Sequence, residues 1–231
     1  MTPSIRPLGD SAAIVKWTGA DDGEIDRAVR QAIAALSHTP ARESGDRFES
    51  VVPAFDSITV HYSPSRLAFR EVAGIIEQAM QYAESKPPVA SNRIEIPVCF
   101  DLTLAPDLVE LATTHGLLPE DVIQRFCSVE YSVRMIGFSP GFPYLSGLPQ
   151  ELATPRRTSP RLKVPPGSVA IGGRQAGIYS QETPGGWNII GRTPRRLFRA
   201  ELSQPCLLTA GDQVQFLPIR ADEFHNWRDE Q

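Results

Sequence analysis

Residues 131–145, YSVRMIGFSPGFPYL, decide the fold of the larger part of this sequence. The stretch opens with a short β run, Tyr131–Met135, and then breaks into glycines and prolines, which interrupt regular structure. Short β runs separated by Gly and Pro continue as far as Ile219, and Gln213–Leu217 is the clearest of them. This spacing predicts a β-barrel or a β-sandwich for the C-terminal part of the chain.

Upstream of this stretch, the first 85 residues alternate strand patterns with helix patterns. Apolar residues recur with a period of two over 13–17 and again over 58–62. Over 25–36 and 72–80 they fall on one face of a helix, and Asp21 or Asp22 is available near the start of the first helix. The pattern predicts an α+β domain with helices on one face of a sheet.

The segment Glu84–Asn92 separates these two parts, because it is polar and carries a proline pair that blocks continuation of the preceding helix. We therefore expect an α+β domain over residues 1–88 and a β domain over 93–231. The second domain should begin with a strand over 94–100. Two short helices should follow, one running from near Asp107 to Gly116 and one with Pro119 at its first position.

Composition excludes several classes of protein. Hydrophobic residues make up 41% of the chain and charged residues 22%, as in ordinary globular proteins. We expect a cytoplasmic protein without a membrane partner, since no apolar run approaches a bilayer span and the N-terminus lacks the features of a signal peptide. The three cysteines have no metal-ligand spacing, so no metal site is predicted. A net charge of −4 gives no general attraction for nucleic acid.

Charge is nevertheless uneven along the chain. Residues 156–199 contain nine basic residues and a single acid, Glu182. A local positive patch in an acidic protein suits a small anion or an acidic partner surface better than a polyanion. The alternative is a solvated face with scattered interface arginines.

Conventional catalytic motifs are missing from the sequence. Gly137–Gly141 has the letters of a G-x-S-x-G nucleophile elbow, but the residue after the serine is Pro140, which has no N–H to offer an oxyanion. Gly172 and Gly177 have the spacing of a P-loop but lack the Lys-Ser/Thr that completes one. The four histidines are widely separated. The catalytic residues therefore stay unassigned.

The remaining signal is a series of Gly/Pro/aromatic loops. Glycines let a backbone pass close to a ligand, prolines hold loops in place, and aromatics supply rigid contact area, which favours a preorganised recognition surface. Tight turns of a β domain are the alternative. The candidate surface comprises Gly137, Phe138, Pro140, Gly141, Phe142, Pro143, Tyr144, Pro166, Gly167, Ser168, Pro184, Gly185 and Gly186.

Three runs in this region, Met135–Leu145, Pro155–Ile171 and Thr183–Pro194, together resemble one known family. Its members are variously called allophanate hydrolase subunit 1, the 5-oxoprolinase subunit of the B type and the Kip-type sporulation kinase inhibitor. The resemblance implies an N-terminal ferredoxin-like domain and a C-terminal cyclophilin-like β-barrel. It also implies a companion subunit of the C type and ATP-dependent opening of 5-oxoproline, a small anionic cyclic amide, to glutamate. In one departure, Cys127 stands where many members are expected to have histidine.

For such an enzyme we expect ATP, with Mg²⁺ in the complex, and neither a metal nor an organic cofactor held by this chain. Arg161 and Arg192 are candidates for pairing with a carboxylate or phosphate through the guanidinium fork. Gln175 and Tyr179 could orient the amide, and Trp187 could wall the pocket. Two alternatives are open: an inhibitor that docks on a sensor histidine kinase, and an accessory subunit of allophanate hydrolase or urea carboxylase.

Overall fold

A computed structural model describes residues 3–37, 48–84 and 91–228. It divides the chain into two units, Met1–Ala90 and Ser91–Gln231. Most of the expected linker, Glu84–Asn92, lies outside the described residues, because 85–90 are not among them. The expected domain limits at residues 88 and 93 stay a prediction.

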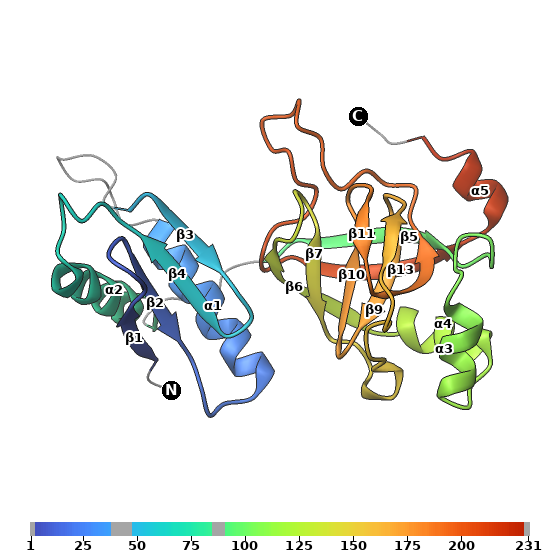
Figure 1. The fold of residues 1–231 in the computed structure, drawn as a ribbon, viewed down its shortest axis with the longest axis horizontal. Helices are drawn as coiled ribbons and strands as arrows, with labels where there is room; N and C mark the ends of the chain where they lie inside the picture. The colour runs from blue at the N-terminus through green and yellow to red at the C-terminus, as the bar shows by residue number, and fades with distance from the viewer. Residues whose placement is uncertain (1–2, 38–47, 85–90, 229–231) are drawn as a thin grey trace. The chain divides into compact units, whose positions relative to one another are not determined.

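The N-terminal unit is a four-stranded antiparallel sheet with two helices (Figure 1). Its strands lie side by side in the order β1-β2-β4-β3. The elements are β1 (Ser4–Pro7), β2 (Ala12–Lys16), α1 (Asp22–Ser37), β3 (Ser50–Pro53), β4 (Ser57–His61) and α2 (Phe69–Glu84).

Apolar periodicity explains this unit. Val15 and Ile58 are fully buried on one face of the sheet, and Val29 and Ile76 pack against that face from the two helices. Helix α1 begins where the sequence predicts, because Asp21 Oδ1 accepts the N–H groups of the first turn at 2.8 and 2.9 Å. Both predicted helices and the two predicted strands of this unit are confirmed.

The order of these elements is a permuted version of the predicted ferredoxin-like order. A ferredoxin-like domain runs βαββαβ, whereas this unit runs ββαββα. Strand β1 occupies the sheet edge that the last strand of the βαββαβ order would fill, next to β2. The sheet is therefore the expected one, but its edge strand comes from the N-terminus.

The C-terminal unit is a closed seven-stranded barrel, which confirms the predicted β-barrel (Figure 1). Around the barrel the order is β10-β7-β6-β13-β5-β12-β9, and β9 pairs with β10 to close it. Its strands are β5 (Arg93–Cys99), β6 (Glu130–Ile136), β7 (Pro143–Ser146), β9 (Ser168–Gly172), β10 (Gln175–Ile178), β12 (Asn188–Arg192) and β13 (Gln213–Ile219).

Further elements surround the barrel. Strands β8 and β11 form a separate two-stranded sheet, and the helices lie between or after the barrel strands. They are α3 (Leu108–Thr114), α4 (Pro119–Cys127), the 3₁₀ helix η1 (Gln150–Leu152), β8 (Arg161–Val164), β11 (Thr183–Gly185) and α5 (Ala221–His225). No helix among the described residues is long and apolar enough to cross a membrane.

Large side chains fill the barrel core. Phe126, Tyr131 and Phe216 are fully buried, and the rings of Phe126 and Phe216 stack with centroids 4.8 Å apart. The Tyr131 hydroxyl donates to the backbone oxygen of Phe126 at 2.9 Å, so its polar end is satisfied within the core. Helix α4, which carries Phe126, is thereby fixed against strands β6 and β13.

Candidate basic pocket

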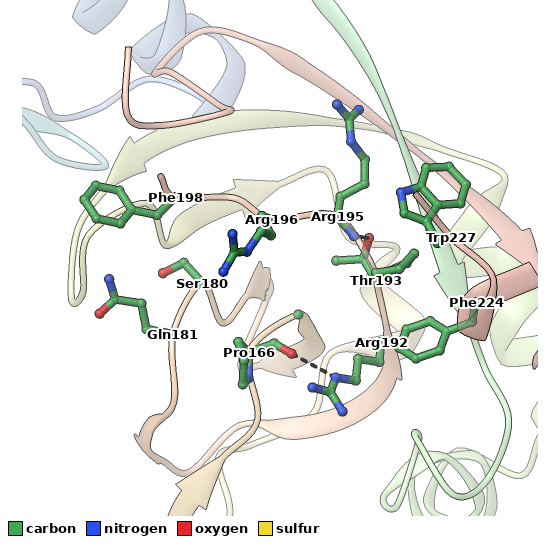
Figure 2. Close-up of a pocket in the computed structure, with 12 residues that line it drawn as sticks. Pro166, Ser180, Gln181, Arg192, Thr193, Arg195, Arg196, Phe198, Phe224 and Trp227 are labelled. Atoms are coloured by element: carbon green, nitrogen blue, oxygen red, sulfur yellow. Dashed lines mark hydrogen bonds between the residues drawn. The ribbon is translucent and has the colours of Figure 1, made fainter. Parts of the chain in front are cut away.

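An open pocket of about 540 Å³ lies on the C-terminal unit (Figure 2). Three arginines, three aromatic residues and small polar groups line it, and no acidic residue does. We call it the Arg192 pocket. Its lining residues are Pro166, Gly167, Ser180, Gln181, Arg192, Thr193, Pro194, Arg195, Arg196, Phe198, Phe224 and Trp227.

Arg192 is held in the pocket by backbone and aromatic contacts. It is the last residue of β12, its Nε donates to the Pro166 oxygen at 2.8 Å, and its guanidinium lies 6.0 Å from the Phe224 ring centroid. Neither terminal nitrogen of its fork has a partner among the described residues. Burial lowers the pKa of Arg192 from its ordinary value, so an anion would recover part of the cost of desolvation.

The other two arginines differ in direction. Arg195 points away from the middle of the pocket in Figure 2, and its Nη1 donates to the backbone oxygen of Glu95 at 3.3 Å. The Arg196 side chain extends toward Ser180. A ligand in the pocket would therefore meet the guanidinium groups of Arg192 and Arg196.

Glycine at position 167 is required by the close approach of two backbone segments. Its φ is +82°, and a Cβ there would collide with the backbone oxygen of Thr193. The two segments are joined in addition by the Thr193 N–H, which donates to the Gly167 oxygen at 2.9 Å. The turn before β9 is thereby held against the end of β12, which places Pro166 beside Arg192.

The loop after β6 borders the pocket on the side of Ser180. The Ser180 hydroxyl donates to the Pro140 oxygen at 2.6 Å and lies 3.3 Å from the Ser139 hydroxyl. Phe138, in the same loop, has a φ of +66° and is 61% exposed. Because Ser139 hydrogen-bonds another serine, its surroundings are not those of a serine nucleophile paired with a base.

Arg161 lies in a different arrangement from Arg192. Its Nη2 donates to Asp107 Oδ1 at 2.7 Å, and Arg157 Nη1 donates to the same oxygen at 2.8 Å. The other carboxylate oxygen accepts the Ile189 N–H at 2.7 Å. Asp107 is 2% exposed, so one buried carboxylate ties two arginines and strand β12 together.

The remaining predicted substrate residues gather in an aromatic cluster. Tyr179 and Trp187 are buried, and both pack with Phe142, at centroid distances of 5.3 and 5.6 Å. Burial raises the pKa of Tyr179, while a hydrogen bond from the Trp187 backbone and nearby arginines oppose the shift. Gln175 begins β10 at the edge of this region. Tyr179 and Trp187 thus lie within a buried cluster, and their predicted contact with substrate stays a prediction.

Two glycines make room for this cluster: Gly185, which belongs to the candidate surface, and Gly177, which does not. A Cβ at Gly177 would lie 2.8 Å from the Phe142 ring, and one at Gly185 would collide with the Tyr179 hydroxyl. Phe142 is 2% exposed. At these positions the turn-and-core interpretation of the loops describes the structure better than the recognition surface.

The structure therefore brings together only part of the predicted site. Pro166, Gly167 and Arg192 meet in the pocket, whereas Arg161 binds Asp107. Sequence reasoning missed Asp107 as a partner of the arginines. It also missed the aromatic walls Phe198, Phe224 and Trp227. The concentration of basic residues over 156–199 was the feature of the sequence that could have indicated this pocket, because Arg195 and Arg196 belong to that window.

Cys127 ends helix α4 and is partly buried. Burial raises the pKa of its thiol to about 12, so it is neutral at physiological pH and is a poor nucleophile. Within residues 3–37, 48–84 and 91–228, no group of three or more His, Cys, Asp or Glu side chains could hold a metal ion.

A family model and individual relatives among known proteins both match this chain. Residues 3–208 match the family model of the carboxyltransferase domain, subdomain C and D. The 5-oxoprolinase subunit of the B type from Bacillus subtilis (strain 168) is 37% identical over 236 residues, covering 98% of this chain and 97% of that protein. The protein of the same name from Escherichia coli O157:H7 is 44% identical over 168 residues, covering 72% of this chain and 76% of that protein.

A solved structure extends the comparison to the fold. The crystal structure of TTHA0988 matches with a TM-score of 0.75 and 30% identity over 94% of this chain. The match covers 41% of that protein, so this chain spans about two fifths of its length. The likeness includes both units of the chain.

Proposed function

This chain belongs to the family of 5-oxoprolinase subunits of the B type, and on that premise we propose that it works as one subunit of an ATP-dependent 5-oxoprolinase. In this proposal it acts in the cytoplasm with a companion subunit of the C type. The complex opens 5-oxoproline to glutamate at the expense of ATP, with Mg²⁺ as the counterion of the nucleotide.

The observation that carries the proposal is the Arg192 pocket. Both reactants are anions, since 5-oxoproline has a carboxylate and ATP has a triphosphate. A pocket with three arginines and no acidic residue in its lining is suited to such ligands. Arg192 offers the two terminal nitrogens of its fork, the geometry that binds a carboxylate or a phosphate in a bidentate manner.

Phosphorylation of the amide oxygen of 5-oxoproline by ATP would activate the carbonyl carbon of the ring amide for attack by water. The role we assign to this chain is to bind and orient the anionic reactants. A companion subunit supplies the remaining groups, because Ser139 hydrogen-bonds another serine and the raised pKa of Cys127 keeps its thiol neutral. This division of labour explains why subunits are needed together.

Glutamate release measured with ATP and 5-oxoproline tests the proposal. We expect no turnover by the purified chain alone and robust turnover when its companion subunit is added. Arg192→Ala should lower kcat/KM roughly 10- to 150-fold, as for loss of a charged hydrogen bond made in the transition state. Lys163→Ala is the matched control, because Lys163 is a basic residue of the same window with a 77% exposed side chain that pairs with Glu182.

Release of glutamate by this chain without a partner would refute the subunit role. A complex that binds both reactants but never forms glutamate would refute the activity.

A further inference from the structure

We propose that the Arg192 pocket is the nucleotide site, with the triphosphate on Arg192 and Arg196 and the adenine base between Phe198 and Gln181. The proposal rests on the proposed function for the identity of the nucleotide as ATP. It assigns ATP to this chain rather than to the companion subunit.

The size of the pocket favours a ligand larger than 5-oxoproline. Allowing about 30 Å³ per non-hydrogen atom, the volume of a water molecule in the liquid, 5-oxoproline needs at most about 270 Å³. The pocket offers about 540 Å³. A bound 5-oxoproline would leave about half of this space to solvent. By the same allowance ATP, with its 31 non-hydrogen atoms, needs at most about 930 Å³, so it would fill the pocket and extend through its open mouth.

The charges of the pocket favour a multivalent anion. A single carboxylate can occupy one guanidinium fork, but the pocket presents those of both Arg192 and Arg196 (Figure 2). The pocket lining contributes no carboxylate that would compete with such a ligand. A triphosphate supplies several acceptor oxygens at different positions, so it can pair with both arginines at once.

The far side of the pocket has the chemistry of a base-binding wall. Phe198 and Gln181 both line the pocket, and Figure 2 draws them on the same side of it, opposite Phe224. Phe224 is already in contact with the Arg192 guanidinium, and Trp227 lies near Arg195, so Phe198 is the aromatic face on the side of Gln181 that we assign to the base (Figure 2).

Gln181 supplies selectivity at this wall. Its amide has no hydrogen-bond partner among the described residues, although it lines the pocket. A glutamine amide offers one donor and one acceptor side by side, which matches the donor and acceptor edge of adenine. The guanine edge presents a different pattern, so we expect the site to prefer adenine nucleotides.

Isothermal titration of the full-length chain with a non-hydrolysable β,γ-imido analogue of ATP tests the proposal. The same titrations use inorganic tripolyphosphate, the corresponding GTP analogue and 5-oxoproline as separate probes. We expect the ATP analogue to bind, and to bind more tightly than tripolyphosphate and the GTP analogue. Where the isolated chain binds too weakly to measure, the complex with the companion subunit is titrated in its place.

Variants separate the two halves of the site. Arg192→Ala should weaken both the ATP analogue and tripolyphosphate roughly 10- to 150-fold. Gln181→Ala should weaken binding of the ATP analogue several-fold and reduce its preference over the GTP analogue. It should leave the affinity for tripolyphosphate unchanged. Lys163→Ala should leave every affinity within about twofold, because it removes the same charge outside the pocket.

Several results would overturn the proposal. Unchanged affinity of the complex for the ATP analogue in Arg192→Ala would place the nucleotide elsewhere. Competition between 5-oxoproline and the ATP analogue, with 5-oxoproline weakened by Arg192→Ala, would make this the substrate site. In both cases glutamate release by the wild-type complex would leave the proposed function standing, and nucleotide binding without glutamate release would remove that function alone.

Discussion

Replacing Asp107 by asparagine should destabilise the C-terminal unit by about 3 kcal/mol. Asp107 is 2% exposed, and one of its oxygens accepts from both Arg157 and Arg161. Removing one partner of a buried ion pair costs about 3–5 kcal/mol, because the other charge is left uncompensated. The side chains of Arg157 and Arg161 are 31% and 26% exposed, so water reaches part of each and we take the lower end of that range.

An asparagine keeps one feature of the site. Its amide oxygen can still accept the N–H of Ile189, so the anchor to β12 survives and the loss is mainly electrostatic. For a unit of this size about 3 kcal/mol corresponds to a fall in Tm of about 6–12 °C. Urea and thermal unfolding of the full chain, followed by tryptophan fluorescence and circular dichroism, measure both quantities.

Glu110→Gln is the control for this variant. Glu110 also approaches Arg157, at 3.6 Å, but its side chain is 78% exposed, so we expect a change of less than about 0.5 kcal/mol. A double-mutant cycle of Asp107→Asn with Arg161→Ala should give a coupling energy of at least about 1 kcal/mol. Stability of Asp107→Asn within about 0.5 kcal/mol of the wild type, or additivity of the two substitutions, would refute this electrostatic role.

Further predictions concern packing, backbone, a thiol and the domain limits. Gly172→Ala should cost about 1–3 kcal/mol in chemical unfolding, because its Cβ would lie 2.5 Å from the Trp187 ring; a variant as stable as the wild type would contradict this packing. Phe138→Gly should be about 1 kcal/mol more stable than Phe138→Ala, since the φ of residue 138 is +66°. Equal melting temperatures of the two variants would argue against this positive-φ backbone conformation. Cys127 should resist Ellman's reagent at pH 8 in the native state and react once unfolded, because burial raises its pKa from 9.0 to about 12; its contribution to stability is then lost as the pH rises above about 9. A fragment of residues 91–231 should melt cooperatively, and a broad melt would mean that the two parts depend on each other.

Local patterns predicted most of the secondary structure. Alternation in the segments that became β2 and β4, and helical spacing in those that became α1 and α2, are properties of neighbouring residues, so they can be read without the fold. The strands β6 and β13 were likewise recognisable. The permuted order of the N-terminal sheet was not, because pairing between β1 and β2 at the sheet edge depends on contacts between segments.

The candidate site was predicted less well for a physical reason. Asp107 has the sequence context of a helix start, and the structure places it there without a side-chain capping bond. Its carboxylate instead binds Arg157 and Arg161, which lie 50 and 54 residues further along the chain. The wall residue Phe224 likewise reaches Arg192 only through the fold. Such long-range pairings leave no periodicity or motif to detect.

The parallel pairing of β5 with β13 has a consequence for biosynthesis. These strands are the first and last of the barrel, and Arg93 pairs with Gln213, 120 residues later. Until the ribosome has released the segment through Ile219, β5 lacks this neighbour and β6 lacks its other partner. Contacts of such large sequence separation form slowly, and unpaired strand edges invite aggregation. Chaperone dependence of the nascent C-terminal unit should therefore end only after β13 has left the ribosome, whereas the N-terminal sheet can form before β13 is made.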